Sequence, residues 1–333
     1  MKQALITGGL GFIGSHVCLE LLKSGYSIII IDDLSNSSRD KLDLIKSYSE
    51  KNYNTVKEQI IYYEFNLTNY EKLKEVFENN KIDVVIHLAG YKAVSESIMN
   101  PIMYYENNII STLNLVKIME LYKVWNLIFS SSATVYGNVQ TPYSETSQTG
   151  IGITNPYGRS KYFQEEILKD LSISNNKWNI IILRYFNPIG HINSDFKENP
   201  NGIPNNLFPF ITKVYNGDLD YLRIFGSDYN TRDGTCLRDF IHVVDLANSH
   251  TVCSNYITNN NCSLKIYNVG TGNNCSVLEL INAFEKENNT KICYKMIERR
   301  SGDIESSYSN VDLIYNELGW KTKYNINDSV KLV

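Results

Sequence analysis

Tyr157 and Lys161 stand four residues apart in the segment NPYGRSK, residues 155–161. On a helix this spacing places both side chains on one face, about one turn apart. An ammonium group beside a phenol stabilises the phenolate, so the pair can supply a base that removes a proton from a hydroxyl. The same pattern also describes an ordinary tyrosine–lysine pair on a helix surface, and only the surrounding sequence can decide between the two.

The first half of the chain alternates apolar runs with helical segments. Strands are predicted at 2–7, 26–32, 59–65, 82–88, 125–131 and 178–186, and helices at 12–24, 69–79, from 101 and at about 156–173. The apolar runs are continuous, which is typical of strands buried on both faces. The sequence therefore predicts an α/β fold with a doubly wound parallel sheet of the Rossmann type.

This alternation ends at about residue 187. The stretch 188–206 is rich in Asn, Pro and Gly and is predicted to be a loop, and shorter, mixed elements follow it. We expect two interleaved domains: 1–187 for the cofactor and 188–333, smaller and α/β, mainly for the substrate. Residues 226–250 are expected to return to the first domain.

A glycine-rich turn joins the first predicted strand to the first helix. The segment ITGGLGFIGSH, residues 6–16, contains Gly8, Gly11 and Gly14 in the pattern TGxxGxxG. Glycines there allow a tight turn and close backbone approach to a pyrophosphate, which the helix N-terminus attracts. Asp32 ends the second strand, where a carboxylate binds ribose hydroxyls and repels the extra phosphate of NADP, so the expected cofactor is NAD. Asp33 is an alternative for this role, and Arg39 leaves NADP as the lesser alternative.

A serine completes the candidate site. The segment FSSSATVYG, residues 129–137, places Ser132 at the C-terminal end of the fifth strand, the ligand-binding edge of such a sheet. We expect Ser132, Tyr157 and Lys161 to converge there. Together with the glycine turn this favours a catalytic Tyr157, whose pKa we expect Lys161 and an oxidised nicotinamide to lower from about 10.

The chain resembles the extended short-chain dehydrogenase/reductases, and among them the UDP-glucose 4-epimerase family, from residue 1 to about 330. The segments that carry the resemblance are TGGLGFIGSH, AGYKAVSESI, NNIISTLNL, FSSSATVYG, NPYGRSK, LRYFNPIG, GIPNNL, RDFIHVVDLA, YNVGTG and ERRSGD. The resemblance implies reversible C4 epimerisation of UDP-glucose and UDP-galactose through a 4-keto sugar. Tyr157 would take the C4 hydroxyl proton with help from Ser132, hydride would pass to tightly bound NAD and return to the other face, and Lys161 would also hold the nicotinamide ribose.

The resemblance also implies a set of binding residues. The implied cofactor contacts are Gly8, Gly11, Phe12, Ile13, Gly14, Asp32, Asn36, Asn66, Leu67, Leu88, Ala89, Gly90, Lys92, Asn107, Ser130, Tyr157, Lys161 and Tyr185. The implied substrate contacts are Lys92, Ser132, Tyr157, Asn187, Asn206, Leu207, Phe225, Arg238, Arg300, Asp303 and Ser307. A guanidinium can bind a diphosphate through two hydrogen bonds. For Arg238 the alternative is a surface ion pair with Asp239 or Asp233.

Two departures from the family pattern bear on specificity. Asn66 stands where the family usually has an Asp beside the adenine, which we expect to alter NAD affinity but not abolish binding. Ser307 stands at the position that gates the sugar pocket, where a bulky Tyr would restrict it to glucose and galactose. The small Ser307 predicts that UDP-GlcNAc and UDP-GalNAc are also interconverted, although a shift of one residue would place Tyr308 there instead.

Other enzymes and a non-catalytic protein on the same fold are the alternatives. Related dehydratases carry an Asp-Glu pair where this chain has Ala133 and Thr134, which argues against a dehydratase or a decarboxylase. A non-catalytic NAD-binding sensor would not need Ser132, Tyr157 and Lys161, although the fold itself does not establish activity.

Composition sets the remaining expectations. The net charge is −4, with 32 Lys and Arg against 36 Asp and Glu, which favours neither a nucleic-acid surface nor a polybasic membrane patch. No secretory signal or apolar membrane span is recognised, and the six scattered cysteines indicate reduced thiols rather than disulfides or a metal site. We therefore expect a cytoplasmic enzyme without metal. The resemblance implies a homodimer through helices near 101–122 and 157–173.

Overall fold

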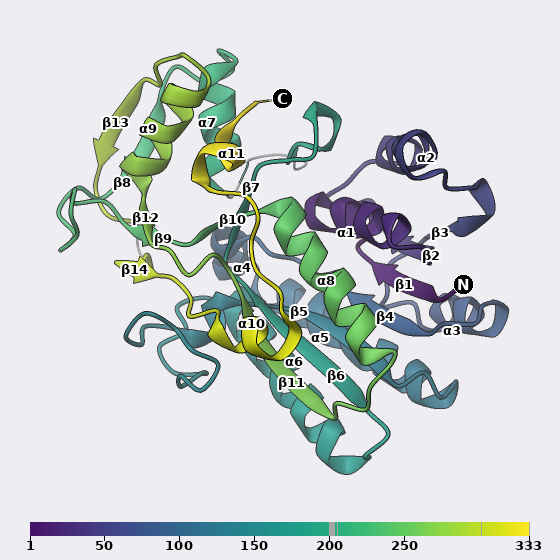
Figure 1. Cartoon of the computed structure of the whole chain (residues 1–333). Helices are drawn as coiled ribbons and strands as arrows, with labels where there is room; N and C mark the ends of the chain where they lie inside the picture. The colour runs from purple at the N-terminus through teal and green to yellow at the C-terminus, as the bar shows by residue number, and fades with distance from the viewer. Residues whose placement is uncertain (200–203, 205, 301, 333) are drawn as a thin grey trace.

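A parallel seven-stranded sheet forms the centre of the computed structural model, which describes residues 1–199, 204, 206–300 and 302–332. Its strand order is β11-β6-β5-β4-β1-β2-β3, and every neighbouring pair is parallel (Figure 1). The strands are β1 (Gln3–Thr7), β2 (Ser27–Asp32), β3 (Ile60–Glu64), β4 (Val84–His87), β5 (Asn126–Ser132), β6 (Asn179–Tyr185) and β11 (Leu264–Val269).

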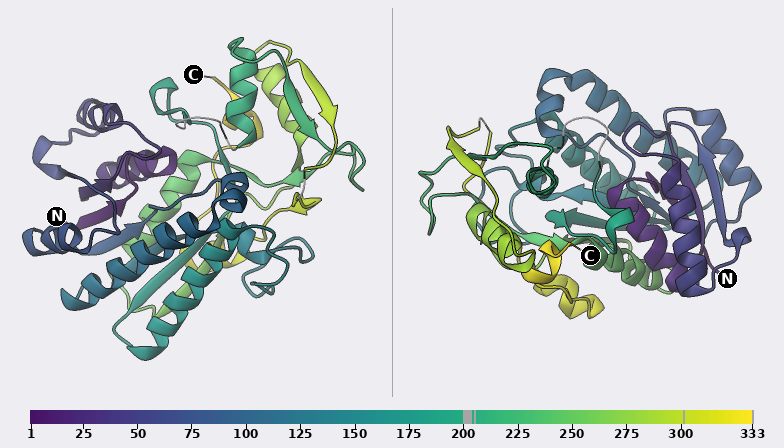
Figure 2. Two further views of the ribbon diagram at one scale, coloured as in Figure 1. Left: turned by 180° about the vertical axis from the view of Figure 1, so that it is seen from behind. Right: turned by 90° about the horizontal axis from the view of Figure 1, so that it is seen from above.

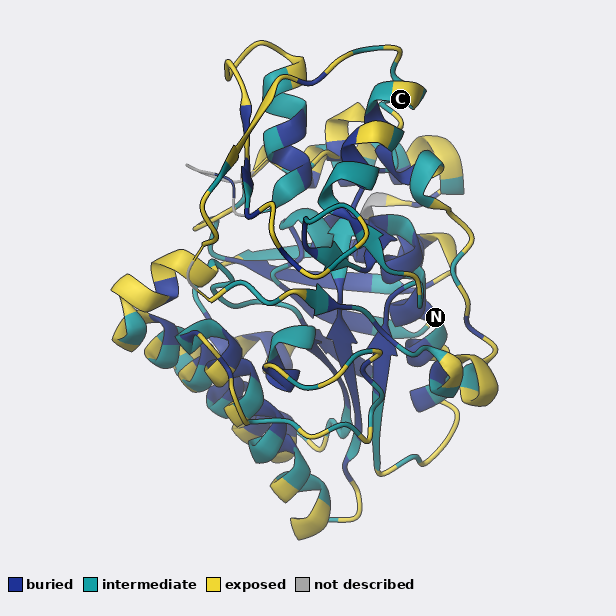
Figure 3. Ribbon diagram, turned by 90° about the vertical axis from the view of Figure 1, so that its left-hand side faces the viewer, coloured by how far each residue is buried: buried dark blue, intermediate teal, exposed yellow. Residues whose placement is uncertain are grey.

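The burial of β2 shows why this sheet must be covered on both faces. Ile28 and Ile30 belong to one hydrophobic cluster, and Ile29 and Ile31 to a second one. Successive side chains of a strand point to opposite faces, so a run of four isoleucines needs apolar partners on each side. Each fully buried isoleucine contributes about 1.5–3 kcal/mol of transfer free energy. In Figure 3 the central strands of the sheet are largely buried.

Helices supply those two layers. On one face α1 (Phe12–Lys23) packs against α8 (Val243–Ile257), with α2 (Asp40–Tyr53) beside α1. On the other face α5 (Pro101–Leu121) lies between α3 (Tyr70–Asn79) and α6 (Pro156–Ser174), as the two views of Figure 2 show. The predicted Rossmann-type α/β fold is confirmed.

A second group of elements gathers beyond the carboxyl ends of the strands, around its own hydrophobic cluster (Figure 1). It contains α7 (Leu207–Tyr215), α9 (Val277–Glu287), α11 (Ile326–Val330) and the parallel strands β8 (Leu222–Phe225) and β13 (Tyr294–Ile297). Short strands join it to the large sheet: β7 (Asn187–Ile189) pairs with β10 (Phe240–His242), and β9 (Leu237–Arg238) lies between β12 (Cys275–Ser276) and β14 (Ser306–Ser307). The remaining elements are α4 (Val94–Met99), α10 (Asp312–Leu318) and the 3-10 helices η1 (Lys57–Gln59), η2 (Ala133–Tyr136) and η3 (Ser194–Phe196).

The chain passes back to the large sheet after β10. Helix α8 packs on α1, and β11 then pairs with β6 as the seventh strand. The segment expected to return, 226–250, overlaps the beginning of α8 but ends before β11. In the part of the chain that is described, no helix is both long enough and apolar enough to cross a bilayer.

Candidate active site

The glycine turn and the loop after β4 meet at the carboxyl edge of the sheet. Gly8 has φ +70°, and a Cβ atom on it would lie 2.9 Å from the backbone nitrogen of Ala89. The Thr7 hydroxyl accepts hydrogen bonds from the amides of Leu88 and Ala89, both at 3.2 Å. A Cβ atom on Gly14 would collide with the Gly8 carbonyl. Both glycines are therefore required for the two loops and α1 to approach this closely.

The start of α1 offers its amides to an anion. Helix α1 begins after Gly11, and no described side chain caps this end. Its first residues are Phe12, which packs edge-on against His16, and Ile13, which borders the hydrophobic cluster under α1. Uncapped amides and the positive end of the helix dipole fit the pyrophosphate of a dinucleotide.

Asp32 lies directly beside this turn. Its Oδ2 accepts from the Leu10 amide at 2.9 Å, and its Oδ1 accepts from the Leu34 amide at 3.0 Å and the Ser37 hydroxyl at 2.7 Å. Burial raises the pKa of Asp32, which these hydrogen bonds oppose. The carboxylate is thus fixed at the end of β2, as ribose binding requires, and Asn36 lies exposed on the same loop.

Asn66 has a partner that explains its departure from the family pattern. Its Nδ2 donates to Asp33 Oδ2 at 2.6 Å and to Asn107 Oδ1 at 3.1 Å. An aspartate at position 66 would face the Asp33 carboxylate, whereas the amide can donate to it. The buried Leu67 follows, so the chain after β3 is anchored beside the end of β2.

Tyr157 lies in the first turn of α6, where Asn155 caps the helix by accepting from the Gly158 amide at 2.8 Å. Burial raises the pKa of Tyr157, and the contacts with the Ser132 side chain and the Lys92 ammonium lower it. Among the protein groups, desolvation of the phenolate outweighs these contacts, and the expected lowering of the pKa by an oxidised nicotinamide stays a prediction. The cation that acts on Tyr157 is Lys92 rather than Lys161.

Lys161 lies one turn after Tyr157 on α6 and reaches the end of β5. Its Nζ donates to the Ser130 carbonyl at 2.7 Å and lies 4.8 Å from the centre of the Phe129 ring. Burial lowers the pKa of Lys161 to about 7, an effect that Glu165, one turn further along α6, partly opposes. A lysine with a pKa so near neutral is a poorer fixed charge than expected but can take part in proton transfer.

Tyr185 ends β6 next to this group. Its hydroxyl shares a hydrogen bond of 2.5 Å with His250 Nε2, and burial raises its pKa. The ring is buried, so the structure places Tyr185 at the edge of the expected cofactor region with its hydroxyl directed to α8.

Asn108 is a residue that the sequence reasoning missed. It is fully buried; its Nδ2 donates to the Tyr91 carbonyl and to the Ser160 hydroxyl, both at 3.0 Å, and its Oδ1 accepts from the Tyr91 amide at 2.8 Å. It therefore holds the loop with Gly90 and Lys92 against α5 and α6. A polar residue at a buried position of the predicted helix from 101 was the available signal.

Lys92 and Asn206 meet at a second residue that was missed. Glu198 accepts from Lys92 Nζ at 2.9 Å, and both of its oxygens accept from Asn206 Nδ2, at 2.8 and 3.1 Å. Asn206 precedes α7, and Leu207 is the first residue of that helix. The motif GIPNNL that carries these two residues lies partly outside the described residues.

Phe225, Arg300 and Asp303 form one group at the far side of the site. Arg300 makes two hydrogen bonds to Asp303, at 2.8 and 3.2 Å, and its guanidinium carbon lies 5.2 Å from the centre of the Phe225 ring. The Thr154 hydroxyl, just before α6, donates to the Gly302 carbonyl at 3.4 Å. This contact links the group to the segment that leads into Tyr157.

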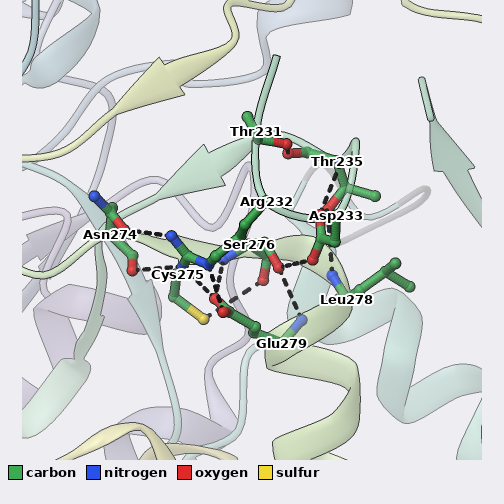
Figure 4. Close-up of polar contacts among 9 residues, drawn as sticks. All are labelled: Thr231, Arg232, Asp233, Thr235, Asn274, Cys275, Ser276, Leu278 and Glu279. Atoms are coloured by element: carbon green, nitrogen blue, oxygen red, sulfur yellow. Dashed lines mark hydrogen bonds and ion pairs between the residues drawn. The ribbon is translucent and has the colours of Figure 1, made fainter. Parts of the chain in front are cut away.

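Among the described residues, Arg238 makes no ion pair. The alternative role, a surface ion pair with Asp239 or Asp233, is therefore not seen. Asp239 instead accepts from the amides of Thr271 and Gly272 and from Ser309, while Arg238 Nη1 donates to the Leu237 carbonyl at 2.8 Å. Figure 4 shows that Asp233 is bound to Thr235 and Ser276. The guanidinium therefore keeps donors for a ligand.

Strand pairing fixes the position of Ser307. The register of β14 on β9 pairs Ser307 with Arg238. The residue after Arg238 in turn contacts β7, because the Asn187 amide donates to the Asp239 carbonyl at 2.9 Å. Paired residues on neighbouring strands point to the same face of a sheet. Ser307 therefore shares the face of Arg238, and Tyr308, the next residue, does not.

Comparisons with known proteins agree with this geometry. A family model described as GDP-mannose 4,6 dehydratase matches residues 5–333. The UDP-glucose 4-epimerase of Haemophilus influenzae is 48% identical over 95% of this chain and 91% of its own length. The chain belongs to the UDP-glucose 4-epimerase family. This membership confirms the expectation of an epimerase.

Solved structures of the family superpose over nearly the whole chain. A UDP-glucose 4-epimerase from Bifidobacterium longum, in complex with NAD+ and UDP, has a TM-score of 0.92 and 44% identity and covers 99% of this chain and 96% of its own. The UDP-Glc/GlcNAc 4-epimerase of Campylobacter jejuni has a TM-score of 0.83 and 35% identity, with coverage of 99% and 98%. NAD, the expected cofactor, is thus bound in a relative of the same fold.

Proposed function

We propose that this epimerase interconverts UDP-glucose and UDP-galactose at C4 with NAD, and that Tyr157 is its acid/base. The observation that supports this most directly is that Tyr157, in the first turn of α6, interacts with the Ser132 side chain at the end of β5 and with the charge of Lys92, both of which lower its pKa. In this setting the Tyr157 phenolate can take the proton of a C4 hydroxyl, and the phenol so formed can return a proton to the oxygen of the 4-keto sugar. The Ser132 hydroxyl can orient that oxygen by hydrogen bonding. When bound, NAD supplies a hydride acceptor that returns the hydride within the same turnover.

The residues around the glycine turn fit this cofactor. Gly8 and Gly14 leave room for a backbone-bound pyrophosphate, and Asp32 presents a buried carboxylate to the adenosine ribose. The other cofactor-binding residues proposed are Gly11, Phe12, Ile13, Asn36, Asn66, Leu67, Leu88, Ala89, Gly90, Lys92, Asn107, Ser130, Tyr157, Lys161 and Tyr185. The Lys161 ammonium donates to the Ser130 carbonyl, and its other N–H groups can donate to the nicotinamide ribose.

The second group of elements is proposed to hold the nucleotide sugar. Arg238 and Arg300 can each bind a phosphate through two N–H groups, and the Phe225 ring can pack on the uracil. The other proposed substrate contacts are Lys92, Ser132, Tyr157, Asn187, Asn206, Leu207, Asp303 and Ser307.

The chain is also proposed to accept UDP-GlcNAc and UDP-GalNAc. Ser307 is a small residue on the same face of the sheet as Arg238, which supports space for a 2-acetamido group beside the sugar. A relative whose name includes both activities has the same fold over nearly the full length.

A homodimer through α5 and α6 is proposed as the assembly. The two helices pack side by side, and Ile102, Ile110 and Phe163 expose 65%, 41% and 44% of their surfaces. Burying such side chains in a second copy removes apolar area from water. In light scattering, Phe163→Glu should shift the protein to the monomer mass, whereas Tyr315→Glu on α10 should not; a monomeric wild type would overturn the dimer.

We also propose a cytoplasmic location, which the six free thiols support.

Tyr157→Phe tests the proposed base. This variant should bind NAD as the wild type does but lose epimerase activity by about 10²–10⁴-fold, because general acid–base catalysis contributes that much. Activity is measured by NMR of the UDP-galactose/UDP-glucose ratio, and NAD content by absorbance after denaturation. An active Tyr157→Phe variant would overturn the assignment. A variant without NAD would show that the Tyr157 hydroxyl is needed to retain the cofactor, and its loss of activity would then not identify the tyrosine as the base.

A further inference from the structure

Glu198 connects the two sides of the active site. It lies after η3, in the loop that leads to α7, and its side chain is only 7% exposed. Its carboxylate accepts from the Lys92 ammonium at 2.9 Å and from the Asn206 amide at 2.8 and 3.1 Å. A carboxylate this well buried needs charged or polar partners, and Lys92 is its cation.

Lys92 is in turn the cation that acts on Tyr157. It comes from the loop after β4, which Asn108 fixes through Tyr91. Burial lowers the pKa of Lys92, but the Glu198 carboxylate more than offsets this and raises it above the ordinary value. The positive charge on Lys92 is one of the two influences that lower the pKa of Tyr157.

We propose that Glu198 is a positioning residue of the active site, whose carboxylate holds the Lys92 ammonium beside Tyr157 and compensates part of its charge. The proposal rests on the proposed role of Tyr157 as the acid/base. The proposal adds that Glu198, which precedes α7 of the substrate side, sets how strongly the Lys92 ammonium stabilises the Tyr157 phenolate.

The other ionisable groups around Tyr157 do not supply a charge that could replace the effect of Lys92 and Glu198 on its phenolate. Tyr104 on α5 and Tyr185 on β6 both interact with the Tyr157 charge, and each is kept neutral because burial raises its pKa. Lys161 lies one turn along α6 and donates to the Ser130 carbonyl. The phenolate of Tyr157 is therefore stabilised by the Ser132 side chain and, among the charged groups, by Lys92, whose effective charge depends on Glu198.

The consequence is a shift in the pH profile. Glu198→Gln keeps the size and one acceptor oxygen but removes the negative charge beside Lys92. The uncompensated ammonium stabilises the Tyr157 phenolate more strongly, so the acidic limb of the profile should move to lower pH. A neighbouring charge shifts a pKa by about one unit or more at close range, and we expect about 0.5–1 unit because the effect is transmitted through Lys92.

A double-mutant cycle tests this transmission. The acidic limb of kcat/KM is measured with UDP-galactose and the NAD-loaded enzyme for the wild type, Glu198→Gln, Lys92→Met and the double variant. Glu198→Gln should lower the midpoint, Lys92→Met should raise it, and Glu198→Gln should have no further effect in the Lys92→Met background. A shift that persists without Lys92, or an unshifted Glu198→Gln limb, would overturn the proposal.

Two controls separate the causes of failure. Glu285→Gln on α9 removes a comparable carboxylate, 10% exposed and paired with Lys291, and should leave the profile unchanged. If the residual activity of Tyr157→Phe keeps the same acidic limb, then the base is another group and the proposed role of Tyr157 fails. If Tyr157→Phe loses the acidic limb while the Glu198→Gln and Lys92→Met variants show no coupling, then only the role of Glu198 fails.

Discussion

The ion pair between Arg184 and Glu165 supports the end of the strand that carries Ser132. Arg184 on β6 bonds to Glu165 on α6 at 2.6 and 3.0 Å, and the two side chains are 2% and 0% exposed. Glu165 Oε1 also accepts from the Ser131 hydroxyl at 2.5 Å. Removing either charge leaves the other one buried without a counter-ion, which costs far more than removing both.

We therefore predict strong non-additivity. Arg184→Met and Glu165→Gln should each lower the free energy of unfolding by about 3–5 kcal/mol, the cost of leaving one buried charge unpaired. The double variant buries no charge and leaves only unpaired neutral groups, so its loss should be about 1–3 kcal/mol. The sum of the two single losses would be about 6–10 kcal/mol, which gives a coupling of several kcal/mol.

Urea unfolding followed by circular dichroism measures these losses. The comparison is valid when the variants share the slope of the free energy of unfolding against urea concentration. Lys169→Met on the same helix removes a surface partner of Glu166 and is the control; it should cost less than about 1 kcal/mol. Single variants that each lose under about 1 kcal/mol, or losses that simply add in the double variant, would refute the reasoning.

Three further predictions concern specificity and pH. Ser307→Tyr should abolish UDP-GalNAc conversion in an NMR assay while UDP-galactose conversion stays within a few-fold, and intact UDP-GalNAc conversion would exclude the gate. Asn66→Asp should weaken NAD binding in a fluorescence titration by roughly fivefold, because two facing carboxylates repel each other by about 1 kcal/mol. The double variant Asp33→Asn/Asn66→Asp should restore the binding, and equal NAD affinities of the wild type and Asn66→Asp would contradict this prediction. Burial lowers the pKa of His87 to about 3 and of His242 to about 4, so the unfolded chain binds more protons below pH 6.5. Stability should therefore fall as pH drops from about 6.5 toward 4, by up to about 1.4 kcal/mol per pH unit for each histidine, and a flat urea midpoint over this range would contradict it.

The parts of the fold that follow from local pattern were predictable. The isoleucine run of β2 required two covered faces, and the close contact of Gly8 with Ala89 follows from a glycine turn at the edge of a parallel sheet. Strand β11 was not predicted, because its sequence LKIYNV mixes polar and apolar residues and its first three positions are only partly buried.

The electrostatics of the site could not be predicted from local sequence. The spacing of Tyr157 and Lys161 suggested that Lys161 would tune the tyrosine, but the helix directs Lys161 to the Ser130 carbonyl. Lys92 acts on Tyr157 instead, and its partner Glu198 is 106 residues away in the chain. Such pairs, and the burial that raises the pKa of Tyr157, arise only when distant segments fold together.

The central claim is that the purified protein epimerises C4 by removing a hydride and returning it within one turnover. The most direct test gives UDP-galactose labelled with deuterium at C4 to the protein as purified, and follows the products by NMR. The account predicts UDP-glucose that retains the deuterium at C4. No conversion even after NAD is supplied, or product in which the label has been replaced by a solvent proton, would contradict it.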